Sequence, residues 1–180
     1  MYNSSEMTPL SQEDTFNVNS AIGWLELGNQ HEAADHLQKI SAAGRSHPQV
    51  METEYRIAYE AKQWGVCLNS ARMFRAACPG EISGWIQESI ALHKLGKTQE
   101  AYDLLSSATE LGGQQWSFWY NWACYSCRLG NLPEAKEWLK RAFQFAEKAG
   151  VLRNVREHAT TDEDLKELLA GGTQTGQSCS

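Results

Sequence analysis

Apolar residues return every three to four positions along most of this chain, which is the spacing that places them on one side of an α-helix. Segment 95–108 shows the pattern best: a Leu-Gly pair leads into Glu-Ala, and leucines and alanines follow at helical spacing. Similar segments begin at Leu27 and Leu129, and a weaker one begins at Ala61. The alternation typical of strands does not persist anywhere. The pattern therefore predicts an all-α fold of helices joined by short turns.

The turn residues of these four segments lie at one fixed interval. Gly28, Lys62, Gly96 and Gly130 each follow the previous one by 34 residues. One helix is predicted before each turn and another after it, so each period forms a helix–turn–helix unit. Four copies in phase without an insertion are hard to obtain by chance, and we interpret them as tandem repeats.

This period predicts one continuous domain over residues 11–170, made of four repeats and a capping helix. The predicted boundaries are about 14–47, 48–81, 82–115 and 116–149 for the repeats, and about 161–170 for the capping helix. Each repeat buries its apolar side against its neighbours, so the last repeat needs a cap of this kind.

The capping helix is predicted to begin at Thr161, whose hydroxyl suits a helix N-cap, and to carry a leucine stripe that starts at Leu165. Residues 151–158 either extend the last repeat helix or form a connector. The two ends, residues 1–10 and 171–180, have the polar composition that predicts disorder.

Small or apolar residues recur at equivalent places in all four periods. The three sets are Ala33, Cys67, Ala101 and Ala135; Leu37, Ala71, Leu105 and Leu139; and Ile40, Phe74, Ala108 and Ala142. Trp85 and Trp119 open the first helices of the last two repeats. On these residues the chain resembles the tetratricopeptide repeat family over about residues 14–148. The resemblance implies a right-handed superhelical stack of antiparallel helix hairpins.

The resemblance also implies a function. Members of the family mostly bind peptides or helices along a concave wall, which the first helix of each pair forms. Side chains at i, i+4 and i+7 share one helical face. On this basis the expected groove residues are Glu52, Arg56, Tyr59, Ile86, Ile90, His93, Tyr120, Cys124 and Cys127. This largely apolar wall suits an amphipathic helix or an extended apolar peptide. We expect a non-enzymatic adaptor, scaffold or chaperone-like module, with no catalytic residues, no metal and no cofactor.

Composition narrows the class of partner. The 180 residues carry a net charge of −6, which argues against a general nucleic-acid surface because such a surface needs a basic face. The last repeat helix is locally basic, with Lys136, Lys140 and Arg141, and is expected to be a solvated face. No signal peptide and no membrane span are visible. We therefore expect a cytoplasmic protein whose partner is a protein or peptide, not a nucleic acid or a membrane.

Two alternatives stay open from the sequence. In the first, exposed aromatic residues of the fourth repeat, such as Tyr120, form a homodimer contact and the protein is structural. In the second, Cys124 and Cys127 form a thiol or metal sensor, with His93 as a third ligand from the repeat before. The second alternative is weaker, because a redox pair usually lies at a helix N-terminus and this pair lies inside a predicted helix.

Overall fold

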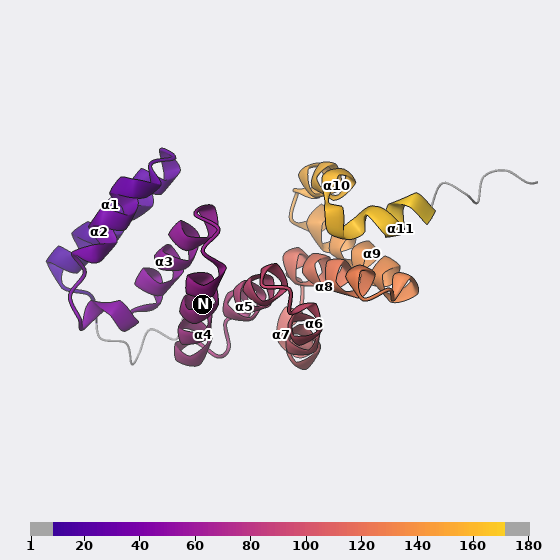
Figure 1. Cartoon of the computed structure of the whole chain (residues 1–180), viewed down its shortest axis with the longest axis horizontal. Helices are drawn as coiled ribbons and strands as arrows, with labels where there is room; N and C mark the ends of the chain where they lie inside the picture. The colour runs from indigo at the N-terminus through magenta and orange to yellow at the C-terminus, as the bar shows by residue number, and fades with distance from the viewer. Residues whose placement is uncertain (1–8, 172–180) are drawn as a thin grey trace, which may run out of the picture. The chain divides into compact units, whose positions relative to one another are not determined.

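The computed structural model describes residues 9–171, whose regular elements are all helices (Figure 1). The all-α prediction is confirmed for this part of the chain. The chain divides between Leu95 and Gly96 into two compact units, and each is described by itself below. The single domain over residues 11–170 and its four repeat boundaries stay predictions.

In residues 9–95, the first unit has two helix hairpins, a short 3-10 helix and one further α-helix. Its elements are α1 (Gln12–Glu26), α2 (Gln30–Gln38), the 3-10 helix η1 (Gly44–Ser46), α3 (Pro48–Glu60), α4 (Trp64–Ala77) and α5 (Ile82–Lys94). Helix α1 packs against α2, and α3 packs against α4, as the helix–turn–helix periods predict. Helix α4 also packs against α5, which opens the third period.

The second unit is built around one long hairpin. Its elements are α6 (Thr98–Ser107), α7 (Thr109–Gly112), α8 (Trp116–Arg128), α9 (Leu132–Lys148), α10 (Leu152–Thr161), the 3-10 helix η2 (Glu163–Leu165) and α11 (Lys166–Gly171). Helices α8 and α9 form the hairpin, α6 packs against α8, and α10 packs against α9.

The recurring small residues lie in the cores of both units. The set that opens each second helix is completely buried: Ala33, Cys67, Ala101 and Ala135 all have 0% of their surface exposed. A small side chain at this place lets the two helices of a pair approach closely. The Cys67 thiol, for example, lies 3.9 Å from the carbonyl oxygen of Tyr55 on the facing helix.

The 34-residue period is also visible in the backbone. Gly28, Lys62, Gly96 and Gly130 all have a positive φ, between 55° and 81°. This left-handed conformation ends a helix, because it lets the next amide reach back to the last turn. Accordingly, the amide of Gln63 donates to the carbonyl of Ala58 at 2.8 Å. Lys62 is the one residue other than glycine with a positive φ among residues 9–171.

Replacing Lys62 by glycine is expected to raise the free energy of unfolding by about 1 kcal/mol. The left-handed conformation costs an L-residue with a side chain about 1–2 kcal/mol, and glycine avoids that cost while losing more chain entropy on folding. Urea denaturation followed by circular dichroism measures the change. Lys62→Ala is the matched control, since it removes the charge and keeps the strain. A stability gain of equal size in both variants would contradict the backbone explanation.

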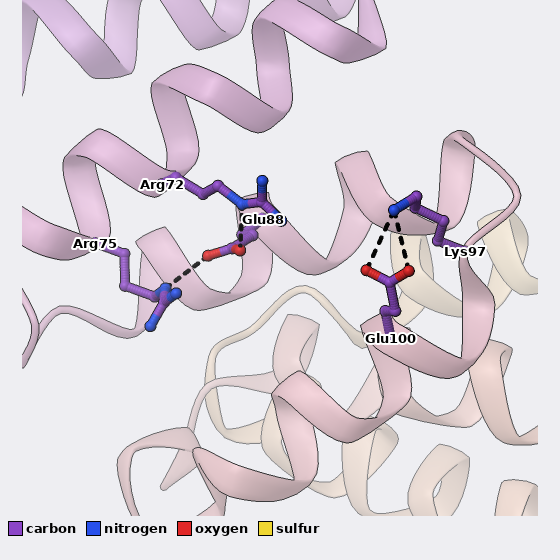
Figure 2. Close-up of polar contacts among 5 residues, drawn as sticks. All are labelled: Arg72, Arg75, Glu88, Lys97 and Glu100. Carbon is purple, nitrogen blue, oxygen red and sulfur yellow. Dashed lines mark hydrogen bonds and ion pairs between the residues drawn. The ribbon is translucent and has the colours of Figure 1, made fainter.

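A buried carboxylate joins α4 to α5 (Figure 2). Glu88 is 3% exposed, and its two oxygens accept hydrogen bonds from Arg72 Nε at 2.9 Å and from Arg75 Nε at 2.6 Å. The two arginines are three residues apart on α4, so they approach Glu88 from the same side. Figure 2 also shows an exposed pair in the second unit, Lys97 with Glu100 at 3.0 Å. The two sites differ in how far the carboxylate is removed from water.

The C-terminal elements differ from the predicted capping helix. Thr161 is the last residue of α10, so residues 152–161 form a helix of their own that packs against α9. Asp162 has extended backbone angles, and its carboxylate accepts from the Asp164 amide at 3.0 Å. An Asx turn of this kind interrupts a helix. The predicted helix over 161–170 is therefore replaced by η2 and α11.

The predicted disordered ends fall mostly outside the described residues. Residues 1–8 and 172–180 lie there, and Pro9 and Leu10 have no regular secondary structure. Gly171 lies within the range predicted to be disordered, but it is the last residue of α11.

Candidate functional site

A hollow of about 300 Å³ opens in the first unit between α1, α3 and α5. Its lining residues are Leu25, Gly28, Gln30, Tyr55, Arg56, Tyr59, Glu60, Gln87 and Ile90. Three of the residues expected in the groove meet here: Arg56 and Tyr59 from α3, and Ile90 from α5. Tyr59 lies one helical turn from Tyr55 on α3, and Ile90 lies one turn from Gln87 on α5. Each pair therefore shares one face of its helix, and both faces line the hollow. We call this hollow the α1–α3–α5 pocket.

One wall of the α1–α3–α5 pocket is a row of aromatic rings. Tyr59 stacks on Tyr55 with ring centroids 5.9 Å apart, and it forms a T-shaped pair at 5.4 Å with Trp64, which lies outside the pocket lining. These two contacts fix the orientation of the Tyr59 ring. The side chain is nevertheless 38% exposed, so a fixed aromatic surface faces solvent. Such surfaces bind well because little rotamer freedom is lost on contact.

Two buried polar atoms in the pocket wall have no hydrogen-bond partner among residues 9–171. They are the Tyr55 hydroxyl oxygen and the side-chain oxygen of Gln87. Burial, with a smaller contribution from Cys67, raises the pKa of Tyr55, so this side chain stays a neutral hydroxyl. The hydroxyl can therefore donate, and the Gln87 oxygen can accept. A buried polar group without a partner costs roughly 1–3 kcal/mol, so both atoms would gain from a bound polar group.

Charges of both signs border the pocket. Arg56 and Glu60 are exposed and lie four residues apart on α3. The other predicted groove residues of the first unit lie outside the lining. Ile86 is buried in the core, and Glu52 and His93 are half-buried on α3 and α5.

The predicted groove residues of the second unit are buried by the C-terminal segment. Tyr120, Cys124 and Cys127 are each at most 5% exposed. The Tyr120 hydroxyl donates to Asp162 Oδ2 at 2.7 Å, and the Cys124 thiol lies 3.7 Å from the same oxygen. η2 packs on α8. In this structure the chain itself therefore occupies the surface that the repeat pattern assigned to a partner.

Burial also determines the chemistry of the two cysteines. It raises the pKa of Cys127 and, together with the carboxylates of Asp162 and Asp164, raises the pKa of Cys124 well above its usual value. The thiolate is the form that reacts and binds metals, so both side chains are held in the less reactive form. Residues 9–171 contain no group of three His, Cys, Asp or Glu side chains arranged to hold a metal ion.

The aromatic residues of α8 form the core of the second unit. Phe118, Trp119, Tyr120 and Trp122 are all buried. Trp122 stacks on Trp138 of α9, with centroids 4.5 Å apart and planes 13° apart. One alternative left open by the sequence uses Tyr120 as an exposed homodimer contact, but in the structure the Tyr120 ring is buried by other residues of the same chain. A homodimer stays a prediction without this surface.

The chain resembles known proteins in structure but not in sequence. No family model matches the chain, and no curated protein matches it. Among the helices of residues 9–171, none combines the length and the apolar content needed to cross a membrane.

Several solved structures share its architecture. MamA from Desulfovibrio magneticus RS-1, residue 41 to its end, superposes with a TM-score of 0.66 at 13% identity, over 94% of this chain and 100% of that one. Another MamA crystal structure gives 0.64 at 14% identity, over 94% and 98%. A thermophilic TPR protein from Thermus thermophilus gives 0.61 at 14% identity, over 90% and 93%. The chain therefore has a fold of the tetratricopeptide repeat type, as its 34-residue period predicts.

Proposed function

We propose that this protein is a non-enzymatic interaction module that binds a peptide or helix of a partner protein in the α1–α3–α5 pocket. The observation that carries the proposal is the unpaired hydroxyl of Tyr55 and the unpaired oxygen of Gln87 in a pocket with a mostly apolar lining. The tetratricopeptide-type fold supports it, because concave surfaces of such arrays serve as binding surfaces.

A peptide segment matches the chemistry of the pocket. A peptide bond carries one carbonyl acceptor and one N–H donor. The carbonyl can accept from the Tyr55 hydroxyl, and the N–H can donate to the Gln87 oxygen. A volume of about 300 Å³ lies at the lower end of the range for ligand pockets, so it suits an anchoring side chain. Leu25, Tyr59 and Ile90 would contact that side chain, and Arg56 and Glu60 would meet polar groups beside it.

The double variant Tyr59→Ala, Ile90→Asp is expected to weaken peptide binding at least about tenfold. It removes the fixed aromatic contact and places a charge in the apolar wall, and such central contacts carry most of the binding energy. Peptides are first selected from a displayed random library on the full-length protein. Their affinities for wild type and variant are then compared by fluorescence polarisation.

The control is Val66→Ala, Met73→Asp, which introduces one alanine and one aspartate at two exposed positions on α4. It should bind as wild type does. Tyr55→Phe tests the polar contact alone: it should leave stability unchanged or slightly raised, and weaken binding about two- to tenfold. Equal affinity in wild type and in the Tyr59→Ala, Ile90→Asp variant would place the binding site elsewhere.

A further inference from the structure

A second hollow, of about 320 Å³, lies in the second unit along α9 and α10. Its floor is apolar and consists of Leu139 and Phe143 from α9 and Leu152 from α10. Its sides carry three cations, which are Lys136, Lys140 and Arg156. We call this hollow the basic groove. It is separate from the α1–α3–α5 pocket, and the inference drawn from it does not depend on that pocket.

The cations and the floor form parallel rows. Lys136 and Lys140 lie four residues apart on α9, as do Leu139 and Phe143, so each pair follows one face of the helix. From the facing helix, the Arg156 guanidinium lies 5.5 Å from the Phe143 ring centre. An apolar strip bordered by positive charge therefore runs along the groove.

The charge of the basic groove is not neutralised within the described chain. Lys136, Lys140 and Arg156 are exposed, and none of them forms an ion pair with another of residues 9–171. One acid, Glu147, also lines the groove. Three cations against one carboxylate contrast with the net charge of −6 of the whole chain. The groove is thus a local positive site on an acidic protein.

Within residues 9–171, the path of the chain leaves this groove uncovered. After α1 and α3, the chain turns at a left-handed residue, and a second helix packs back against the first. After α10, the chain turns instead at Asp162, and Leu165 is buried in a segment that packs on α8 and α9 (Figure 1). The helix that follows α10 is α11, which has six residues and contacts α9 as well as α10, so it does not pair along α10 as the second helix of a repeat does in the first unit.

We propose that the basic groove binds an acidic amphipathic helix of another protein. Leucine-type side chains of that helix would pack on Leu139, Phe143 and Leu152, and its Asp or Glu residues would pair with the surrounding cations. Carboxylates spaced by four residues are about 6 Å apart along a helix axis, which matches the spacing of Lys136 and Lys140. Such helix-in-groove recognition uses one apolar face and charged flanks.

Nucleic acid fits this groove less well. Single strands bind where aromatic rings offer faces for stacking the bases, in addition to positive charge. The floor contains one aromatic ring, and the Arg156 guanidinium already lies over it. The other floor residues are aliphatic. The partner that the observations favour is therefore a helix with its own leucine stripe.

The test uses the full-length protein and a fluorescein-labelled helical peptide that carries leucines at i, i+3, i+4 and i+7 and glutamates on both flanks. A second peptide has lysine at every glutamate position. We expect the acidic peptide to bind at low salt, to bind more weakly as salt rises, and to bind at least about tenfold more tightly than the basic peptide. Fluorescence anisotropy measures all of these affinities.

The double variant Lys136→Glu, Lys140→Glu is expected to weaken binding of the acidic peptide at least about tenfold. The two new carboxylates beside the groove would repel the peptide's glutamates, which the lysines attract. The control Lys39→Glu, Lys148→Glu changes the net charge equally at two exposed lysines outside the groove, and should bind within about twofold of wild type. Circular dichroism must show wild-type helicity in both variants.

Three outcomes would overturn the proposal. They are equal affinity of wild type for the acidic and basic peptides, equal weakening in the groove variant and its control, and tighter binding of a single-stranded RNA than of the acidic peptide.

Discussion

The double variant Arg72→Met, Arg75→Met is expected to lower the free energy of unfolding by about 3–5 kcal/mol. Both arginines bond to Glu88, whose carboxylate is almost completely removed from water. Methionine keeps most of the volume of each side chain but leaves this carboxylate buried without a counter-charge. The desolvation that the two ion pairs offset in the native protein is then uncompensated. Urea denaturation of the full-length protein measures the loss.

Two further variants separate this explanation from a simple loss of packing. Adding Glu88→Met to the double variant should restore most of the lost stability, because an apolar side chain needs no counter-charge. Lys97→Met breaks the exposed pair with Glu100 and should change stability by less than about 1 kcal/mol, as surface ion pairs do (Figure 2). If the triple variant were as unstable as the double variant, the buried charge would not be the cause.

Replacing Leu165 by aspartate is expected to raise the alkylation rate of Cys124 about a hundredfold at neutral pH. Leu165 is completely buried, and burying a leucine contributes about 1.5–3 kcal/mol. An aspartate at this place would have to be desolvated as well, so residues 162–171 would separate from α8 much of the time. A hundredfold change in exposed population corresponds to about 2.7 kcal/mol, within reach of this substitution.

Exposure of Cys124 and the fall in its pKa both increase its alkylation rate. Burial and the carboxylates of Asp162 and Asp164 raise the pKa of Cys124 in the closed state. Release of the segment removes these causes, the pKa falls towards its usual value, and the fraction of reactive thiolate rises. Iodoacetamide labelling followed by peptide mass spectrometry measures the rate for each cysteine separately.

Leu169→Asp is the matched control, since it makes the same change in the same segment at a position that is 41% exposed. It should label at the wild-type rate. Cys67, buried in the first unit, should stay unreactive in all three proteins and so reports that the rest of the fold is intact. Persistent protection of Cys124 in the Leu165→Asp variant would show that the segment does not depend on this leucine.

The repeat pattern predicted much of the fold because it is local and is copied along the chain. Phase alone identified Lys62 as a turn residue, although its side chain disfavours the left-handed conformation that it adopts. The period extends to single hydrogen bonds. Trp85 donates to the carbonyl of Pro79, and Trp119, 34 residues later, donates to that of Gly113, both at 3.1 Å.

The candidate site was predicted in part, for a related reason. Helical spacing and the period placed Arg56, Tyr59 and Ile90 on facing helices, and the structure brings them together. The same reasoning missed Tyr55 and Gln87, because it followed one face and these residues lie at its edge. The signal in the sequence that could have identified these two residues was a polar side chain beside a mostly apolar helix face. Whether such an atom finds a partner depends on neighbouring helices, which spacing along one helix does not report.

The position of the C-terminal segment could not be predicted from its own residues. Its acidic start and leucines indicate a helical, partly buried segment, but they do not identify the surface that receives it. Asp162 bonds to Tyr120, 42 positions earlier in the chain. Contacts at this separation depend on how the intervening helices are packed, and no periodicity of the sequence encodes them.

The covering of α8 by residues 162–171 means that the second unit already carries a tethered competitor for this surface. The segment is tethered to α8 through the folded helices α9 and α10, and for comparison a short flexible linker gives an effective concentration on the order of 1 mM. At that effective concentration, a free partner of equal intrinsic affinity, present at about 1 µM, would hold roughly one such surface in a thousand. The binding free energy measured there for an outside ligand will be the difference between that of the ligand and that of the tethered segment. Shortening the chain before Asp162 would change this difference without altering a single residue of α8.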